Sequence, residues 1–140
     1  MTGMDVAAHK ALIDRMVACY VDAEVDIVPD VAEWCATHVK ASNASAMSGN
    51  PSGKALWNCA DGPNRILLRS PLTEKAIEDH LLGLYLRGFK RVYDVIEDDL
   101  TFLKHLVLHE VARMKHNWGQ DHEIDCDKWA FKELKKWRET

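Results

Sequence analysis

The sequence lacks any apolar run long enough to cross a membrane. Uncharged apolar runs such as residues 81–86 are far shorter than the roughly 18 to 20 residues that span a bilayer. The first ten residues contain Asp5 and lack the basic start and apolar stretch of a secretion signal. We therefore expect no membrane partner and a cytoplasmic location.

Neither a strong excess of one charge nor a familiar catalytic signature is present. Eighteen Lys and Arg residues against 22 Asp and Glu residues give a formal net charge of -4, which disfavours broad affinity for nucleic acids. The sequence contains no glycine-rich phosphate loop and no serine or cysteine nucleophile with a paired base. We expect no direct sequence-specific nucleic-acid binding. Basic residues near the C-terminus are typical of a solvated helix face: Lys132, Lys135, Lys136 and Arg138.

Cysteine is scarce, and no two cysteines form a recognisable pair. The four cysteines are scattered without any C-x-x-C motif, and a chain of this length does not need disulfides to fold. We interpret them as reduced thiols at positions 19, 35, 59 and 126.

The length and composition are those of one ordinary globular domain. A chain of 140 residues buries about two thirds of its unfolded surface without disulfides or metals. Hydrophobic residues at 47% and charged residues at 29% exclude a disordered chain or a fibrous repeat. We predict a single domain over residues 1–140, with N-terminal helices over 1–40, a flexible loop over 41–54 and a core over 55–134.

The N-terminal part of the sequence predicts two helices and a loop. Apolar residues recur at helical spacing between Leu12 and Tyr20, which predicts an amphipathic helix over residues 5–23. Asp30 is a possible cap for a weaker helix that ends near residue 40. Residues 41–54 are rich in Ser, Asn, Gly and Pro, and this composition predicts an exposed loop.

The middle of the sequence predicts a hairpin followed by a helix. Two short apolar segments, residues 55–59 and 65–69, flank a five-residue turn and predict two antiparallel strands. Apolar residues then step along one helical face over residues 72–87, until Gly88 offers a stop. The predicted fold class is α+β: a small, mostly helical domain of about five helices with a short antiparallel β-hairpin.

A fourth helix, over residues 98–116, is the most informative part of the sequence. At ~100° per residue, an apolar stripe lies on one side of this helix and a polar column on the opposite side. The column contains His105, His109, Arg113 and His116. A helix that is apolar on most other sides is predicted to be central, with its polar column facing a cleft or an internal network. A last helix is predicted over residues 123–137.

The polar column contains a zinc-binding pattern that is altered at one position. His109-Glu110-Val111-Ala112-Arg113 matches His-Glu-x-x-His, except that Arg113 stands where the second imidazole should be. In that motif two imidazoles one turn apart bind one zinc ion, and the Glu activates the bound water. Arg113 has no ligand role, because a guanidinium stays protonated and offers no lone pair. By itself, a lone His on a buried helix is more often a hydrogen-bonded core residue than a metal ligand.

The motif and its surroundings resemble the zincin-like metallopeptidase domains of phages and mobile elements. The resemblance covers residues 55–134 and includes the hairpin strand, the helix before the motif and the acidic start of the next helix. It implies that His109 is the first metal ligand, Glu110 the general base and Glu123 the third ligand. It also implies that Asp127 orients an imidazole by a hydrogen bond.

One way to rebuild a metal site is with another imidazole of the same helix. His105 lies one turn before His109 and could share a metal with it. The ligands would then be His105, His109 and Glu123, although Glu110 and Glu123 would be displaced from the inherited arrangement. This alternative predicts an active zinc enzyme.

The other way is to do without the metal. Glu110, Glu123 and Asp127 would then be buried anions without a counter-charge, which is costly unless a cation replaces the ion. Arg113 can supply that cation by pairing with Glu123 or Glu110, which would convert a catalytic site into a structural ion network. Alternatively, Arg113 points to solvent.

The interpretation that we favour from the sequence is a non-catalytic protein that needs no cofactor. It is expected to bind a host protein or protein complex, as a phage or mobile-element inhibitor of a host defence system in the host cytoplasm; this expectation is an analogy. The alternatives are a zinc-dependent metallopeptidase with a non-standard metal site, and a structural or toxin-antitoxin interaction module. Specificity is expected in residues 41–54 and in the first two helices, which lie outside the resemblance.

Overall fold

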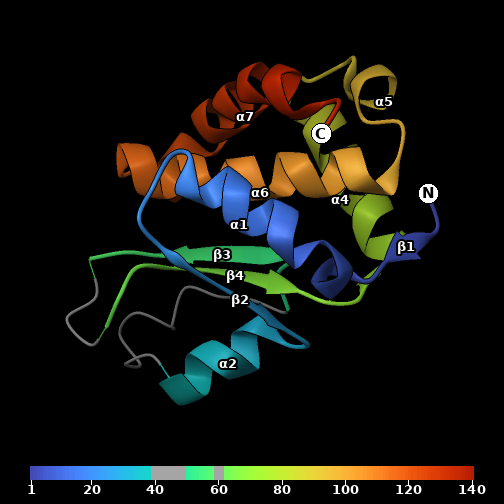
Figure 1. The fold of residues 1–140 in the computed structure, drawn as a ribbon. Helices are drawn as coiled ribbons and strands as arrows, with labels where there is room; N and C mark the ends of the chain where they lie inside the picture. The colour runs from blue at the N-terminus through green and yellow to red at the C-terminus, as the bar shows by residue number, and fades with distance from the viewer. Residues whose placement is uncertain (39–49, 59–61) are drawn as a thin grey trace.

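A mixed three-stranded sheet lies between two layers of helices (Figure 1). The computed structural model describes residues 1–38, 50–58 and 62–140. Strand β4 (Arg65–Arg69) is central, with β2 (Glu24–Val28) parallel on one side and β3 (Gly53–Leu56) antiparallel on the other. One face of the sheet packs against α6 (Asp99–His116) and α1 (Lys10–Ala18), and α7 (Glu123–Trp137) covers α6 from outside. The α+β class is confirmed.

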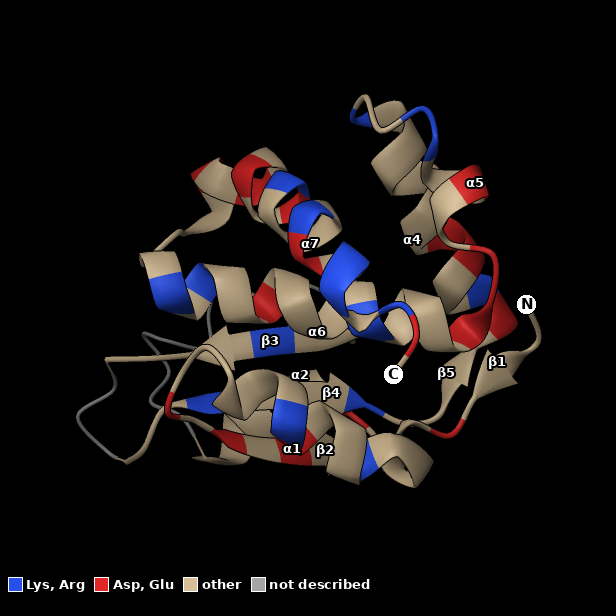
Figure 2. Ribbon diagram, turned by 45° about the horizontal axis from the view of Figure 1, so that its top comes forward, with Lys and Arg blue, Asp and Glu red and all other residues tan. Residues whose placement is uncertain are grey.

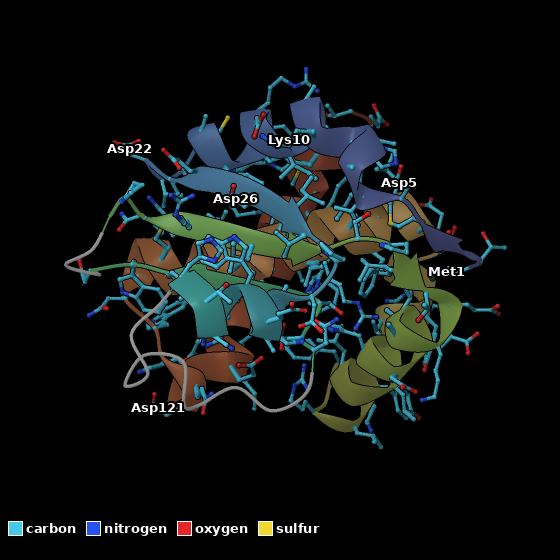
Figure 3. The ribbon with its side chains drawn as sticks, turned by 90° about the horizontal axis from the view of Figure 1, so that it is seen from below. Met1, Asp5, Lys10, Asp22, Asp26 and Asp121 are labelled. Atoms are coloured by element: carbon cyan, nitrogen blue, oxygen red, sulfur yellow. The ribbon has the colours of Figure 1, made fainter. Side chains whose placement is uncertain are left out.

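Both faces of β4 are buried, which explains its continuous apolar sequence. Ile66 and Leu68 face the main core, whereas Leu67 on the opposite face contacts a smaller cluster beneath α2 (Val31–His38). Seen from below, α2 lies across the strands on this second face (Figure 3). The three strands that the described residues contribute to this sheet are therefore packed on both faces.

The predicted hairpin is present as β3 and β4, with Gly53 opposite Leu68 and Leu56 opposite Arg65. Strand β3 begins at Gly53, so the prediction of a loop over residues 41–54 was wrong for its last two positions. The strand predicted over residues 55–59 ends at Leu56, and residues 57 and 58 are not strand. Residues 41–49 of that loop and residues 59–61 of the hairpin connection lie outside the described residues.

The N-terminal prediction needs correction. The helix expected over residues 5–23 is a 3-10 turn (Val6–His9) followed by α1 (Lys10–Ala18), and the chain then enters β2. Strand β2 was not predicted because Glu24 and Asp26 give it a polar sequence. Both carboxylates lie within ion-pair distance of Arg65 on β4, a partner that only the fold brings to them.

Four further elements of the described residues, two strands and two helices, surround the main core. Strand β1 (Gly3–Met4) pairs with β5 (Leu72–Thr73), and Thr73 then caps α4 (Glu74–Leu86) by accepting a hydrogen bond from the Ala76 amide. The helix predicted over residues 72–87 is thus shorter at both ends. Past it, α5 (Val92–Val95) is a short helix that was not predicted.

Helix α6 is the centre of the molecule, as its sequence pattern predicted. Asp98 caps it by accepting from the Thr101 amide at 2.7 Å, and Asn117 ends it in the left-handed conformation. A 3-10 turn (Gln120–His122) then leads into α7 (Glu123–Trp137), with the bounds expected. Within the described residues, no helix is long and apolar enough to cross a membrane.

Candidate functional site

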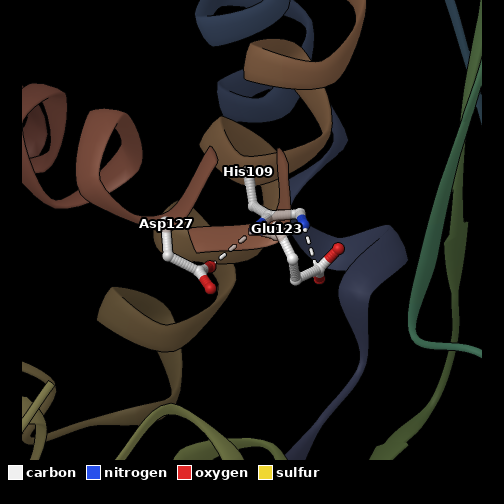
Figure 4. Close-up of side chains that lie close together, drawn as sticks. All are labelled: His109, Glu123 and Asp127. Atoms are coloured by element: carbon white, nitrogen blue, oxygen red, sulfur yellow. Dashed lines mark hydrogen bonds and ion pairs between the residues drawn. The ribbon is translucent and has the colours of Figure 1, made fainter. Parts of the chain in front are cut away.

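The candidate site is formed where α6 and α7 face each other. Helix α6 contributes His109 and Arg113, one turn apart on the same face, and α7 contributes Glu123 and Asp127, again one turn apart. Because the two helices pack side by side, these two short columns meet (Figure 4). The structure thus brings together the residues that the motif singled out on two separate helices.

His109 bridges the two acidic residues of α7. Its Nδ1 lies 2.6 Å from Asp127 Oδ1, and its Nε2 lies 3.2 Å from Glu123 Oε1 (Figure 4). Burial by itself favours the neutral ring, but the hydrogen bonds to Asp127 and Glu123 outweigh it and raise the pKa of His109 to about 10. The raised pKa favours the imidazolium form of His109, in which both ring nitrogens donate.

Arg113 completes the second half of the cluster. Its Nη2 donates to Glu123 Oε2, and its Nε lies 3.5 Å from Glu110 Oε1. Burial would raise the pKa of Glu123, but His109 and Arg113 lower it to about 2. Arg113 points into the site and not to solvent, since only 16% of its side chain is exposed.

A third cation comes from Arg87, the residue directly after α4, and was not foreseen. Arg87 Nη2 donates to Asp127 Oδ2 at 3.1 Å, so the fully buried Asp127 accepts from His109 and from Arg87. Burial would raise the pKa of Asp127, but the His109 hydrogen bond holds it below its usual value. We call the resulting cluster the α6–α7 ion network; it comprises His109, Arg113, Arg87, Glu110, Glu123 and Asp127.

The charges of the α6–α7 ion network balance. With His109 protonated, three cations face three carboxylates, and each carboxylate lies within 3.5 Å of a cationic nitrogen. Buried charges that are paired and hydrogen-bonded avoid most of the penalty of desolvation. The cluster is therefore satisfied by the protein's own side chains.

The same residues only partly meet the needs of a metal ion. His109, Glu123 and Asp127 form a group that could hold one, because a ligand atom from each lies within 4.8 Å of the others. In the observed arrangement, however, Asp127 and Glu123 face opposite nitrogens of one ring. An ion on Nε2 would have Glu123 as its second ligand, and Arg113 stands in the third position. A catalytic zinc site needs three protein ligands, so these side chains do not form one in the arrangement observed.

His105 is placed apart from this cluster. It is fully buried, and neither of its ring nitrogens has a hydrogen-bond partner among the described residues. Its Nε2 is 3.9 Å from Asp127 Oδ1, and its ring centroid is 4.3 Å from that of Phe131. Burial lowers the pKa of His105 to about 3. His105 belongs to no group of three ligand atoms in the described part of the chain, so the structure does not bring it into a ligand set with His109 and Glu123.

The ion network opens into a cleft of about 360 Å³. Residues 51–54 form one wall, and the cleft also contacts His80, Leu106 and Gln120. Gly53 lies so close to α6 that a β-carbon there would be 3.2 Å from Glu110 Cγ. The contribution of residues 51–54 to the cleft was not predicted, because their composition indicated a loop. The contribution of His80 was not predicted either, because His80 belongs to a helix outside the motif.

Comparison of the chain with protein-family models, with curated proteins and with solved structures gave no match. The relation to zincin-like domains therefore stays a prediction from the motif residues and their order.

Proposed function

We propose that this protein is a zincin-like protein in which an ion network has replaced the metal centre, and that it acts by binding another protein and not by catalysis. The observation that carries the proposal is the pair between Arg113 and Glu123. Arg113 stands at the motif position of the second zinc ligand, and Glu123 at that of the third.

The electrostatics of the site support a structural role. The Arg113 guanidinium satisfies Glu123 and lies near Glu110, while His109 donates both of its protons to carboxylates. A protonated His109 has no lone pair for an ion, and Glu110 has a cation beside it in place of a metal-bound water. The side chains that a peptidase would use are thus engaged with one another.

The finer form of the proposal names the partner. A phage or mobile element that keeps a disarmed enzyme fold has a ready scaffold for occluding a host protein, so the proposed partner is a component of a host defence system in the cytoplasm. Support for this part is analogy with other retained enzyme folds, because fold by itself does not determine function.

Metal content tests the loss of the metal centre. Wild-type protein, purified without chelator, and an Arg113→His variant are analysed by native and inductively coupled plasma mass spectrometry. We expect no stoichiometric zinc in the wild type and about one zinc per chain in the variant, because the new imidazole completes a three-ligand set. Lys115→His is the matched control, since it adds an imidazole to an exposed position of the same helix. One zinc per wild-type chain would overturn the proposal.

A second candidate function is a zinc-dependent metallopeptidase with a non-standard site. The observation in its favour is the group of His109, Glu123 and Asp127, together with Glu110 at the cleft. It predicts a chelator-sensitive cleavage of unfolded casein by the wild type that Glu110→Gln abolishes. If zinc-supplemented wild type and Glu110→Gln are equally inactive, this candidate fails.

A further inference from the structure

A second hollow, of about 290 Å³, lies between α5 and α7. Its apolar floor brings Phe89 and Phe131 together with ring centroids 5.1 Å apart. We call it the α5–α7 groove; its lining residues are Phe89, Lys90, Arg91, Val92, Val95, Phe131, Leu134, Lys135 and Arg138.

The rim of the α5–α7 groove carries one sign of charge. Its four ionisable side chains, Lys90, Arg91, Lys135 and Arg138, are all cationic and exposed, in a chain whose net charge is -4. Basic residues lie on both walls, along the C-terminal half of α7 and on the connection between α4 and α5 (Figure 2). Arg91 has Asp94 at 3.7 Å, but both side chains are more than 70% exposed and solvent weakens their attraction. The groove is therefore a local positive site on an acidic protein.

Apolar side chains continue from the groove onto its outer surface. Five large hydrophobic side chains are exposed in the described residues, and four of them lie on α4 and α5: Leu82, Tyr85, Leu86 and Tyr93. The ring centroids of Tyr85 and Tyr93 are 6.1 Å apart. Lys90 from the groove rim places its Nζ 4.2 Å from the centroid of the Tyr85 ring. Contiguous exposed apolar surface of this kind marks an interaction site.

The size of the surface distinguishes a macromolecule from a small ligand. The hollow itself is at the lower end of small-molecule pockets, which are ~300–1,000 Å³, and suits one or two buried side chains. The exposed part of α4 and α5 would be left uncovered by a ligand that filled only the hollow. A polypeptide can fill the hollow with an anchor residue and also cover the outer surface.

We propose that the α5–α7 groove, with the adjoining exposed face of α4, is the docking site for an acidic amphipathic segment of a partner protein. The segment places an apolar side chain over Phe89 and Phe131, and its carboxylates face the four cations of the rim. This proposal goes beyond the proposed function and does not depend on it, because the groove shares no residue with the α6–α7 ion network.

The test is an NMR titration of isotope-labelled full-length protein with a synthetic 16-residue peptide. The peptide is helical, with Leu and Phe at i, i+3, i+4 and i+7 and Glu elsewhere. We expect amide shifts confined to residues 82–95 and 131–138, with binding that weakens at high salt. Shifts centred on another surface would overturn the proposal.

Three comparison ligands separate the possible causes of binding. A peptide with Lys in place of Glu and a peptide with Ser in place of Leu and Phe should each bind at least tenfold more weakly. Vesicles of phosphatidylglycerol and phosphatidylcholine should leave the spectrum unchanged. Equal binding of the basic peptide, or of the vesicles, would contradict an acidic protein segment as the occupant.

Charge-reversal variants test the rim from the protein side. The double variant Lys135→Glu with Arg138→Glu should bind the acidic peptide at least tenfold more weakly than the wild type. Lys10→Glu with Arg15→Glu makes the same change in net charge on α1, which contributes no residue to the groove, and should leave binding unchanged. All four positions are exposed, and far-ultraviolet circular dichroism verifies folding. Undiminished binding to the first variant would overturn the proposal. The peptide comparisons use the wild-type protein, so a folding defect in a variant cannot affect them.

Discussion

The α6–α7 ion network and the α5–α7 groove use the same helix in opposite ways. The first half of α7 turns Glu123 and Asp127 inward, where every charge meets an opposite charge. Its second half and the residue after it turn Lys135 and Arg138 outward beside an apolar floor, where no acidic side chain of the described residues lines the hollow. A buried cluster that is balanced internally stabilises the fold, whereas exposed cations without such balance are available to a partner. The following substitutions test this difference.

Asp127→Asn should have the largest effect on stability. The change removes the buried negative charge and one of the two carboxylate oxygens that accept from His109 and Arg87, so we expect a loss of about 3 kcal/mol in the free energy of unfolding. Urea denaturation measures it. Asp125→Asn, at an exposed position of the same helix, is the control and should change stability by less than about 0.5 kcal/mol. Similar losses in both variants would show that Asp127 has no special role.

The pH dependence of stability should report the charge on His109. Its pKa is raised from 6.5 to about 10 in the folded protein, so its contribution is complete below pH 6.5 and is lost as the pH rises toward 10. Urea midpoints should therefore fall between pH 6.5 and 10, and fall less in His109→Gln. If a metal ion held His109 in its neutral form, stability would instead rise with pH as the ligand loses its proton.

Arg113→Met should cost less than the loss of Asp127. The substitution leaves Glu123 beside His109 but without its second cation, and 35% exposure of the Glu123 side chain lets solvent compensate in part. We expect a loss of about 1–2 kcal/mol. When Glu123→Gln is combined with Arg113→Met, the double variant should recover part of the lost free energy of unfolding, and a double-mutant cycle measures the coupling. A cycle with no coupling energy would mean that the pair does not stabilise the site.

The smallest effect on stability is expected in the α5–α7 groove. Lys135→Glu with Arg138→Glu changes two exposed side chains, so the free energy of unfolding should move by less than about 0.5 kcal/mol. The same urea titration provides the measurement. A loss comparable to that of Arg113→Met would place these cations among the structural charges and remove the contrast between the two regions.

Elements with a strong local pattern were predictable. Helix α7 begins and ends where its sequence indicated, and α6 does so to within one residue, because its apolar stripe and its Asp98 cap act within a few residues of one another. Strand β2 was missed because its polar residues are explained only by Arg65, which is distant in the chain. The short helix α5 carries too few residues for a periodic pattern.

The amino-acid sequence by itself determined which side chains share a helical face: His109 with Arg113, and Glu123 with Asp127. It also determined that Arg113 cannot be a metal ligand, since that follows from the chemistry of guanidinium. Only the tertiary structure decided that the two faces meet, that Arg87 at the end of α4 joins them, and that His105 has no hydrogen-bond partner among the described residues. The physical reason is that helical periodicity acts over a few residues, whereas the pairing of buried charges depends on how separate helices pack.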